Sequence, residues 1–133
     1  MGEENPNNNP RIIVIQKLYS YFLNKGSEIS YPKHRYKKFI KDTVLGTIER
    51  EDLLLENLKK ILQDEFNPSR TDLILKLMIL SATFELIFSH KTPINVIVSE
   101  YVKISDFFLE SAHKGYLNAI LDKVSKNVRK DSE

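Results

Sequence analysis

The residues with the clearest chemical potential form a run of cations interleaved with aromatic rings. Residues 33–41 read KHRYKKFIK, in which the cations are Lys33, Arg35, Lys37, Lys38 and Lys41. Lysine and arginine neutralise phosphates, and aromatic rings stack on unpaired bases, so this segment has the composition of a surface for single-stranded RNA. The alternative is a solvated helix face whose apolar members turn towards the core.

The charges are sorted along the sequence, although the formal net charge is only +2. Residues 11–41 contain eight basic residues and one acid, residues 42–65 contain three basic residues and seven acids, and residues 111–130 contain five basic residues and one acid. Such segregation indicates a basic face for a polyanion and a separate acidic face. Charge blocks that merely face water are the competing explanation.

Three further places carry candidate binding residues. Lys114, Tyr116 and Asn118 combine a cation, an aromatic ring and an amide that together could grip RNA. Alternatively, Tyr116 belongs to the core and Asn118 to a cap or an inter-helix hydrogen bond. Tyr19 extends an apolar stripe and is either a core residue with its hydroxyl at the rim or part of an aromatic surface with Tyr21. Glu85 stands inside the most apolar segment, where an unpaired carboxylate would cost several kcal/mol. It must therefore pair with a local lysine, arginine or backbone donor, or reach the surface as a partner-facing group.

The sequence offers little for catalysis or metal binding. It contains no cysteine, and its histidines, His34, His90 and His113, lie far apart. Phosphate-binding loops, dinucleotide-binding glycine motifs and serine-hydrolase elbows are missing. We therefore expect a protein that is not an enzyme and needs no cofactor. With neither a signal peptide nor an apolar run of about 20 residues, we also expect it in the cytoplasm and not in a membrane.

Hydrophobic periodicity predicts an all-α fold, a compact bundle of six or seven helices. The predicted helices cover residues 11–24, 33–49, 52–64, 71–90, 93–107 and 112–128. Pro32 is placed just before the second helix, Thr92 caps the fifth and Ser111 caps the sixth. The helix at 71–90 is apolar on nearly all sides, which is typical of a central helix surrounded by others. Residues 1–10 are expected to be a disordered leader, 11–128 a single domain and 129–133 a frayed tail.

Several motifs in the C-terminal half resemble those of the transcription antitermination protein NusB family. Residues 75–86, LKLMILSATFEL, look like that family's central helix, which ends in aromatic-Glu-Leu. Residues 92–100, TPINVIVSE, resemble its P-x-x-V-x-I-N-E run, and residues 116–123, YLNAILDK, resemble F-V-N-x-V-L-D-K. In the N-terminal half, residues 16–19 resemble Q-A-L-Y and residues 45–49 resemble L-x-G-V-x-E. The order and spacing of these pieces extend over about residues 11–128.

The resemblance implies two packed helical subdomains and an RNA-binding role. Proteins of this family pair with a small ribosomal protein, called NusE in this role. The pair binds the box A element of nascent RNA and helps to assemble the antitermination complex on RNA polymerase, notably during rRNA transcription. An arginine-rich N-terminal segment contacts RNA in this family, and Arg11 alone stands in its place here, with Lys17 as the next cation.

By the same resemblance, Tyr19 and Glu85 are expected at or near the partner-binding surface. We further expect the stretch of cations between residues 33 and 41 to replace part of the missing arginine-rich arm. The competing hypothesis is a helical protein–protein adaptor, or a homodimer, in which RNA binding is weak or lost.

Overall fold

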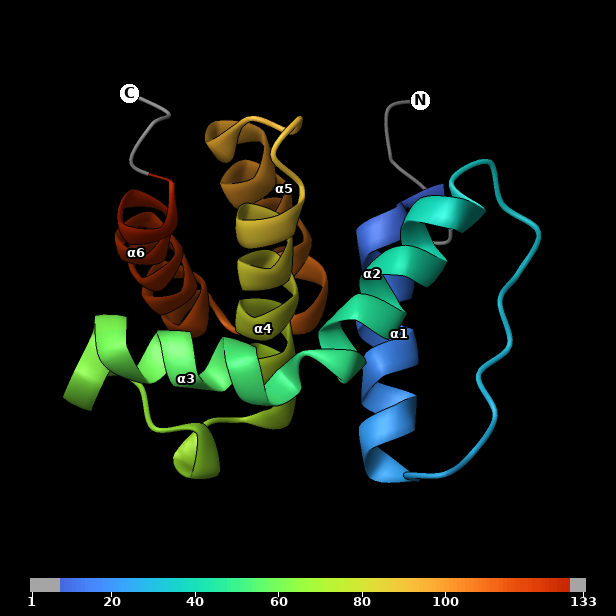
Figure 1. The fold of residues 1–133 in the computed structure, drawn as a ribbon, viewed down its shortest axis with the longest axis horizontal. Helices are drawn as coiled ribbons and strands as arrows, with labels where there is room; N and C mark the ends of the chain where they lie inside the picture. Colours follow the sequence, from blue (N-terminus) through green and yellow to red (C-terminus); the bar gives the residue numbers. More distant parts are fainter. Residues whose placement is uncertain (1–7, 130–133) are drawn as a thin grey trace.

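The computed structural model describes residues 8–129, and this part of the chain is helical without strands. Its α-helices are α1 (Pro10–Leu23), α2 (Lys37–Glu49), α3 (Glu51–Leu62), α4 (Leu73–Phe88), α5 (Ile94–Phe108) and α6 (Ser111–Val128). Two short 3-10 helices, η2 (Gln63–Glu65) and η3 (Pro68–Arg70), connect α3 to α4. The predicted all-α fold is confirmed, with six α-helices in the described residues (Figure 1).

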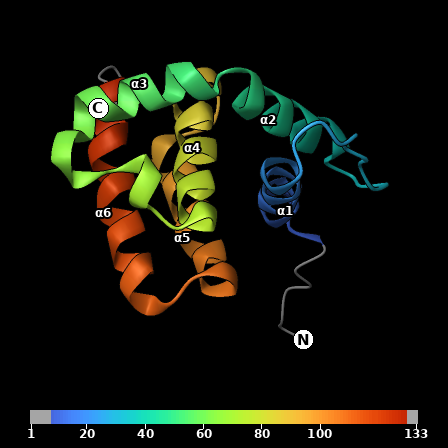
Figure 2. The same ribbon diagram turned by 90° about the horizontal axis from the view of Figure 1, so that it is seen from below.

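Helix α4 is the centre of the molecule, as its apolar composition predicted. It contacts each of the other five α-helices, and every residue from Leu77 to Leu86 is buried. Helices α1 and α2 pack against each other to one side of α4, and α3, α5 and α6 pack with α4 to form the rest of the fold (Figures 1 and 2). The fold thus consists of two helical groups that share one buried helix. Within residues 8–129, no helix has the combined length and apolar character needed to cross a bilayer.

The two helical groups approach closely where α2 crosses α4. A Cβ atom built on Gly46 would lie 2.2 Å from Cζ of Phe84, so only glycine fits beneath this ring. Real Cβ atoms essentially never come within 3.0 Å of another heavy atom. Gly46 therefore sets the distance between the two helical groups.

The N-terminal leader is shorter than predicted. Asn9 is buried, and its side-chain oxygen accepts hydrogen bonds from the backbone N–H groups of Arg11 (3.0 Å) and Ile12 (3.4 Å). Pro10 occupies the first turn of α1, where its missing N–H has no cost. An Asn-Pro pair is an N-cap signal, so α1 begins inside the stretch that was assigned to the leader. Residues 1–7 of the predicted leader lie outside the described residues.

The second helix begins four residues later than predicted. The chain from Asn24 to Tyr36 is irregular, and α2 starts at Lys37. Nδ1 of His34 accepts a hydrogen bond from the backbone N–H of Tyr36 (2.9 Å), and the N–H of Lys37 bonds the carbonyl of His34 (3.1 Å). This turn holds the backbone ahead of α2. Lys33 and Arg35 therefore lie in a connecting segment and not on a helix.

The predicted side-chain caps of the last two helices were wrong. Pro93 precedes the first residue of α5, and Ser111 is itself the first residue of α6. Neither helix has a side-chain hydrogen bond at its N-cap. The helices lie where the periodicity placed them, because the apolar pattern fixes a helix body more firmly than its ends.

Candidate nucleic-acid interface

The five cations of residues 33–41 are all exposed and lie at the entrance to α2. Lys33 and Arg35 belong to the irregular segment, and Lys37, Lys38 and Lys41 belong to the first turns of the helix. The only ion pair that they form in the described chain joins Lys38 to Asp42 at 2.7 Å, with both side chains largely in solvent. Such exposed pairs contribute little to stability. The cations are therefore available to an anionic ligand.

The N-terminus of α2 is poorly suited to hold this much positive charge. The first turn contains no acidic residue, and no side chain caps the free backbone N–H groups. The helix dipole disfavours cations at this end and favours anions. Positive side chains and unpaired N–H groups therefore point to the same place, and both attract phosphate.

An exposed aromatic ring lies directly before this helix. The ring of Tyr36 is 47% exposed, and the guanidinium of Arg35 lies 5.3 Å from its centroid. Tyr36 lines a shallow groove of about 360 Å³ together with Phe39 of α2, Pro10 and Arg11 of α1, and Thr92 and Glu100. A ring of this kind can stack on an unpaired base while neighbouring cations hold the backbone.

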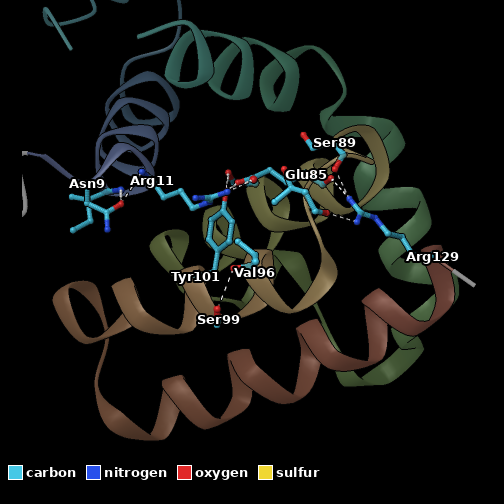
Figure 3. Close-up of polar contacts among 11 residues, drawn as sticks. Asn9, Arg11, Glu85, Ser89, Val96, Ser99, Tyr101 and Arg129 are labelled. Atoms are coloured by element: carbon cyan, nitrogen blue, oxygen red, sulfur yellow. Dashed lines mark hydrogen bonds and ion pairs between the residues drawn. The ribbon is translucent and has the colours of Figure 1, made fainter. Parts of the chain in front are cut away.

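Arg11 does not project into solvent as an RNA-binding arm would. Its Nε donates to Oε2 of Glu85 at 3.0 Å, and its Nη2 donates to Oε1 at 2.6 Å (Figure 3). The guanidinium also lies over the ring of Phe39, 4.8 Å from its centroid. Burial by itself lowers the pKa of Arg11, but the hydrogen bonds and the charge of Glu85 outweigh burial and raise it. Arg11 is thus a fixed charge inside the molecule.

Glu85 is completely buried, so the prediction of a surface carboxylate at this position was wrong. Its Oε2 also accepts a hydrogen bond from the hydroxyl of Tyr101 at 2.5 Å, and that hydroxyl lies 2.6 Å from Oγ of Ser81. The other expectation, that Glu85 pairs with a donor, is confirmed by Arg11 and Tyr101, but the donors are distant in sequence and not local as predicted. Burial, followed by the charge of Glu85, raises the pKa of Tyr101 well above 10.0, so the phenol remains a donor.

This network joins three helices that are distant in sequence. Arg11 comes from α1, Glu85 and Ser81 from α4, and Tyr101 from α5. A buried ion pair whose members keep further hydrogen bonds fixes orientation, because removal of one partner leaves the other charge uncompensated. The network therefore connects α1, from the group of α1 and α2, to α4 and α5. A contribution of Glu85 to partner binding remains a prediction, and it would have to act through Arg11.

Arg129 binds the same turn of α4 from the opposite side, and the sequence did not predict this contact. Its guanidinium donates to the carbonyl oxygens of Leu86 (2.7 Å), Thr92 (2.5 Å), Glu85 (3.1 Å) and Ser89 (2.6 Å). These carbonyls belong to the C-terminal turn of α4 and the loop that follows, and those of Glu85 and Ser89 also accept from the backbone N–H groups of Ser89 (2.8 Å) and Thr92 (3.0 Å). Arg129 is therefore buried and not frayed; the remaining residues of the predicted tail, 130–133, lie outside the described part.

The three candidates on α6 do not form one site. Lys114 pairs with Asp106 at 2.8 Å, and the hydroxyl of Tyr116 donates to the carbonyl of Glu65 at 2.7 Å. Residues two apart on a helix face different directions, so Tyr116 points away from the side that Lys114 and Asn118 share. Asn118 is exposed and lines a groove of about 430 Å³ between α5 and α6. The core-side interpretation of Tyr116 fits this geometry.

The remaining two candidates lie on α1. Lys17 is half-buried, and Tyr19 keeps 37% of its surface exposed, so its ring is accessible to a partner. Both residues lie on the same helix as Arg11 but at its middle, away from the ion pair. Within residues 8–129, no group of three histidine, aspartate or glutamate side chains converges as a metal site would require.

The chain is similar in sequence and fold to proteins of one family. The sequence model of the NusB family matches residues 8–126. The transcription antitermination protein NusB of Rhizobium meliloti is 27% identical over 138 aligned positions, which cover 91% of this chain and 86% of the relative. The protein of the same name from Allorhizobium ampelinum is 31% identical, and its alignment covers 68% of this chain but only 57% of the relative.

A solved structure shows the same fold at lower sequence identity. It is the structure titled T. maritima NusB, P3121, Form 2, which superposes with a TM-score of 0.80. The superposition covers 98% of both chains, and 19% of the aligned residues are identical. At this identity, the likeness describes the arrangement of the helices and not the identity of the surface residues.

Proposed function

The chain belongs to the NusB family, and we propose that it acts in transcription antitermination by binding box A-type RNA together with a small ribosomal protein in the NusE role. The two proteins and the RNA would join the antitermination complex on RNA polymerase during rRNA transcription. This activity is binding in the cytoplasm and involves no catalytic step.

The proposal for RNA is supported above all by the cations of residues 33–41. All five are exposed, and none is neutralised by a buried carboxylate in the described chain. They surround an uncapped helix N-terminus and adjoin the exposed ring of Tyr36. A protein chain selected only for stability has no reason to place lysines in the first turn of a helix. Phosphate binding supplies that reason.

Salt-dependent RNA binding tests this proposal. We expect the wild-type chain with its ribosomal partner to bind a box A-type RNA, with log Kd rising linearly with log salt concentration. The double variant Lys37→Glu/Lys41→Glu should bind at least about tenfold more weakly and show a shallower slope, because fewer counterions are released. Lys60→Glu, which reverses an exposed charge on α3, is the matched control and should bind like the wild type. Equal binding by all three proteins would refute a role for residues 33–41.

A second candidate function is favoured by the state of Arg11. The family's arginine-rich arm is represented here by this one arginine, and its side chain is occupied by Glu85. A helical adaptor that contacts only proteins, or a homodimer, would be compatible with that loss. The salt titration separates the two functions, since an adaptor binds RNA weakly and without a steep slope. Sedimentation of the chain alone identifies the homodimer.

Partner binding is proposed to involve the exposed side of α1. Tyr19 offers an accessible ring with a polar hydroxyl, which is the type of side chain enriched at protein interfaces. Tyr19→Ser should reduce co-purification of the ribosomal protein while leaving the fold intact, because the ring is not part of the core. Tyr21→Ser is the matched control, because Tyr21 is half-buried and residues two apart on a helix face different directions, so the two rings do not form one surface.

A further inference from the structure

One groove of the described surface lies away from the cations of residues 33–41. It has a volume of about 770 Å³ and is lined by α3 residues within 52–59 and by residues within 63–68 of the connection to α4. We call it the α3 groove. In Figure 1, α3 runs across one end of the other helices, and the segment with the 3-10 helices returns beneath it.

The lining of the α3 groove combines apolar and acidic side chains, and we call its carboxylates the acidic rim. Leu53 is 44% exposed and Leu55 is half-buried, whereas Phe66 is buried. The carboxylates of the rim are those of Asp52, Glu56 and Asp64, and none of them forms an ion pair or hydrogen bond through its side chain within residues 8–129. Lys59 is the single cation of the lining. The groove therefore combines exposed apolar area with a net negative rim.

The α3 groove is built by fixed contacts and not by a loose loop. Lys123 bonds the carboxylate of Glu65 at 2.9 Å, and Tyr116 bonds the carbonyl of the same residue at 2.7 Å, which holds η2 against α6. The side chain of Asn67 caps η3 by accepting from the N–H of Ser69 at 3.1 Å. The segment that lines the groove is therefore ordered before a ligand binds. Binding to a preformed groove costs less conformational entropy than binding to a flexible loop.

The chain leaves α3 through a residue with an unusual backbone conformation. Gln63 has φ 50° and ψ −120°, a backbone conformation that residues other than glycine rarely adopt. Strained residues of this kind persist where the surrounding structure holds them, and they gather at binding sites. Here the strained residue ends α3 and begins η2, which contributes Asp64 to the lining of the groove.

We propose that the α3 groove binds a short, extended segment of a partner protein in which lysine or arginine alternates with apolar residues. The acidic rim would pair with the cations, and Leu53 and Leu55 would contact the apolar side chains. Asp52, Glu56 and Lys59 follow one face of α3 over seven residue steps, about 10 Å at 1.5 Å per residue. That length accommodates about three extended residues. RNA is excluded as the occupant because the rim would repel phosphates.

The experiment uses the full chain and a fluorescent Lys-Leu-Lys-Leu-Lys peptide as the probe, with Glu-Leu-Glu-Leu-Glu as the control peptide. Chemical-shift changes on adding the basic peptide should be confined to residues 52–68, and the acidic peptide should cause none. Asp52→Lys/Glu56→Lys should weaken the Kd by about tenfold or more, and Lys59→Glu should tighten it, because rim charges add to complementarity. Glu110→Lys reverses an exposed charge elsewhere and should leave the Kd unchanged.

Other outcomes would overturn the proposal. Shift changes outside residues 52–68, or equal affinity in the Asp52→Lys/Glu56→Lys variant, would place the peptide elsewhere. Self-association of the wild-type chain that this variant abolishes, measured by sedimentation velocity, would identify a second copy as the occupant instead. Box A RNA binding should be the same in all variants of the α3 groove, so failure of this proposal is distinguishable from failure of the RNA-binding function.

Discussion

Gly46 lies directly against the ring of Phe84, so a single missing methyl group lets α2 pack on α4. Gly46→Ala should lower the free energy of unfolding by about 1–3 kcal/mol, because a Cβ atom at this position overlaps the ring and forces the two helices apart. Urea unfolding followed by circular dichroism measures the effect.

Gly115→Ala is the matched control for that substitution. Gly115 lies inside α6, and a Cβ atom there would meet nothing within 4 Å. Replacing an exposed helical glycine by alanine should raise the free energy of unfolding by about 0.5–1 kcal/mol. The two substitutions are chemically identical, so opposite signs isolate the contact with Phe84. Destabilisation by both would contradict this explanation.

Arg11→Ala should be among the most destabilising substitutions near the N-terminus. It leaves the fully buried carboxylate of Glu85 without its cation, which costs about 3–5 kcal/mol when a buried pair loses one member. Calorimetry or urea unfolding would reveal a much lower midpoint.

A double-mutant cycle separates the ion pair from simple loss of packing. In Arg11→Met/Glu85→Leu, both charges are replaced by apolar groups, and the hydroxyl of Tyr101 keeps Ser81 as a partner. This double variant should be more stable than Glu85→Leu alone, since no buried charge is left unpaired. Strictly additive losses would show that the pair makes no special contribution.

The pH dependence of stability should carry a signature of Tyr101. Its pKa is raised well above 10.0 in the folded chain, chiefly by burial and then by the charge of Glu85. The folded state thus holds the phenolic proton more tightly than the unfolded state does. The resulting stabilisation is complete below about pH 10 and is lost as the pH rises above it towards the folded pKa.

Tyr101→Phe tests this assignment because it keeps the ring and removes the titrating group. Free energies of unfolding measured by urea between about pH 8 and pH 11 should fall more steeply in the wild type than in the variant. Lysines also titrate in this range, but they contribute equally to both proteins. Parallel curves would mean that Tyr101 ionises as freely in the fold as in the unfolded chain.

Lys37→Glu should separate stability from RNA binding. Replacing a cation by an anion in the first turn of α2 places favourable charge at the helix dipole, and should raise the free energy of unfolding by about 0.3–1 kcal/mol at low salt. The same change should weaken RNA binding. Thermal unfolding at low and high salt measures the first effect, which salt should reduce. A loss of stability would contradict the view that Lys37 is retained at a structural cost.

The helix bodies could be predicted from the sequence because apolar periodicity reports directly on burial. The apolar stretch around Leu77 identified the central helix, and α1 to α6 lie close to their predicted ranges. The helix ends were less predictable. His34 holds the backbone before α2 through a local hydrogen bond that no propensity encodes, so α2 begins later than Pro32 indicated.

The side-chain partners could not be predicted because they join distant parts of the sequence. Glu85 was correctly recognised as a carboxylate that needs a donor, but Arg11 lies 74 residues away and looked like an RNA-binding residue. Arg129 gave no signal at all, since an arginine near the end of an amphipathic helix usually faces solvent. Only the three-dimensional arrangement shows that it meets four carbonyl oxygens.

Two arginines thus bind the same residue of α4. Arg11 bonds the side chain of Glu85, and Arg129 bonds the backbone carbonyl of Glu85. Both arginines join parts of the chain that are far apart in sequence. Closing such long loops carries an entropic penalty that local helix formation does not. The two arginine contacts should therefore form after the transition state for folding, when the helices have already docked. Removing either arginine contact would then accelerate unfolding far more than it slows folding. Glu85 is therefore a determinant of how long each molecule stays folded.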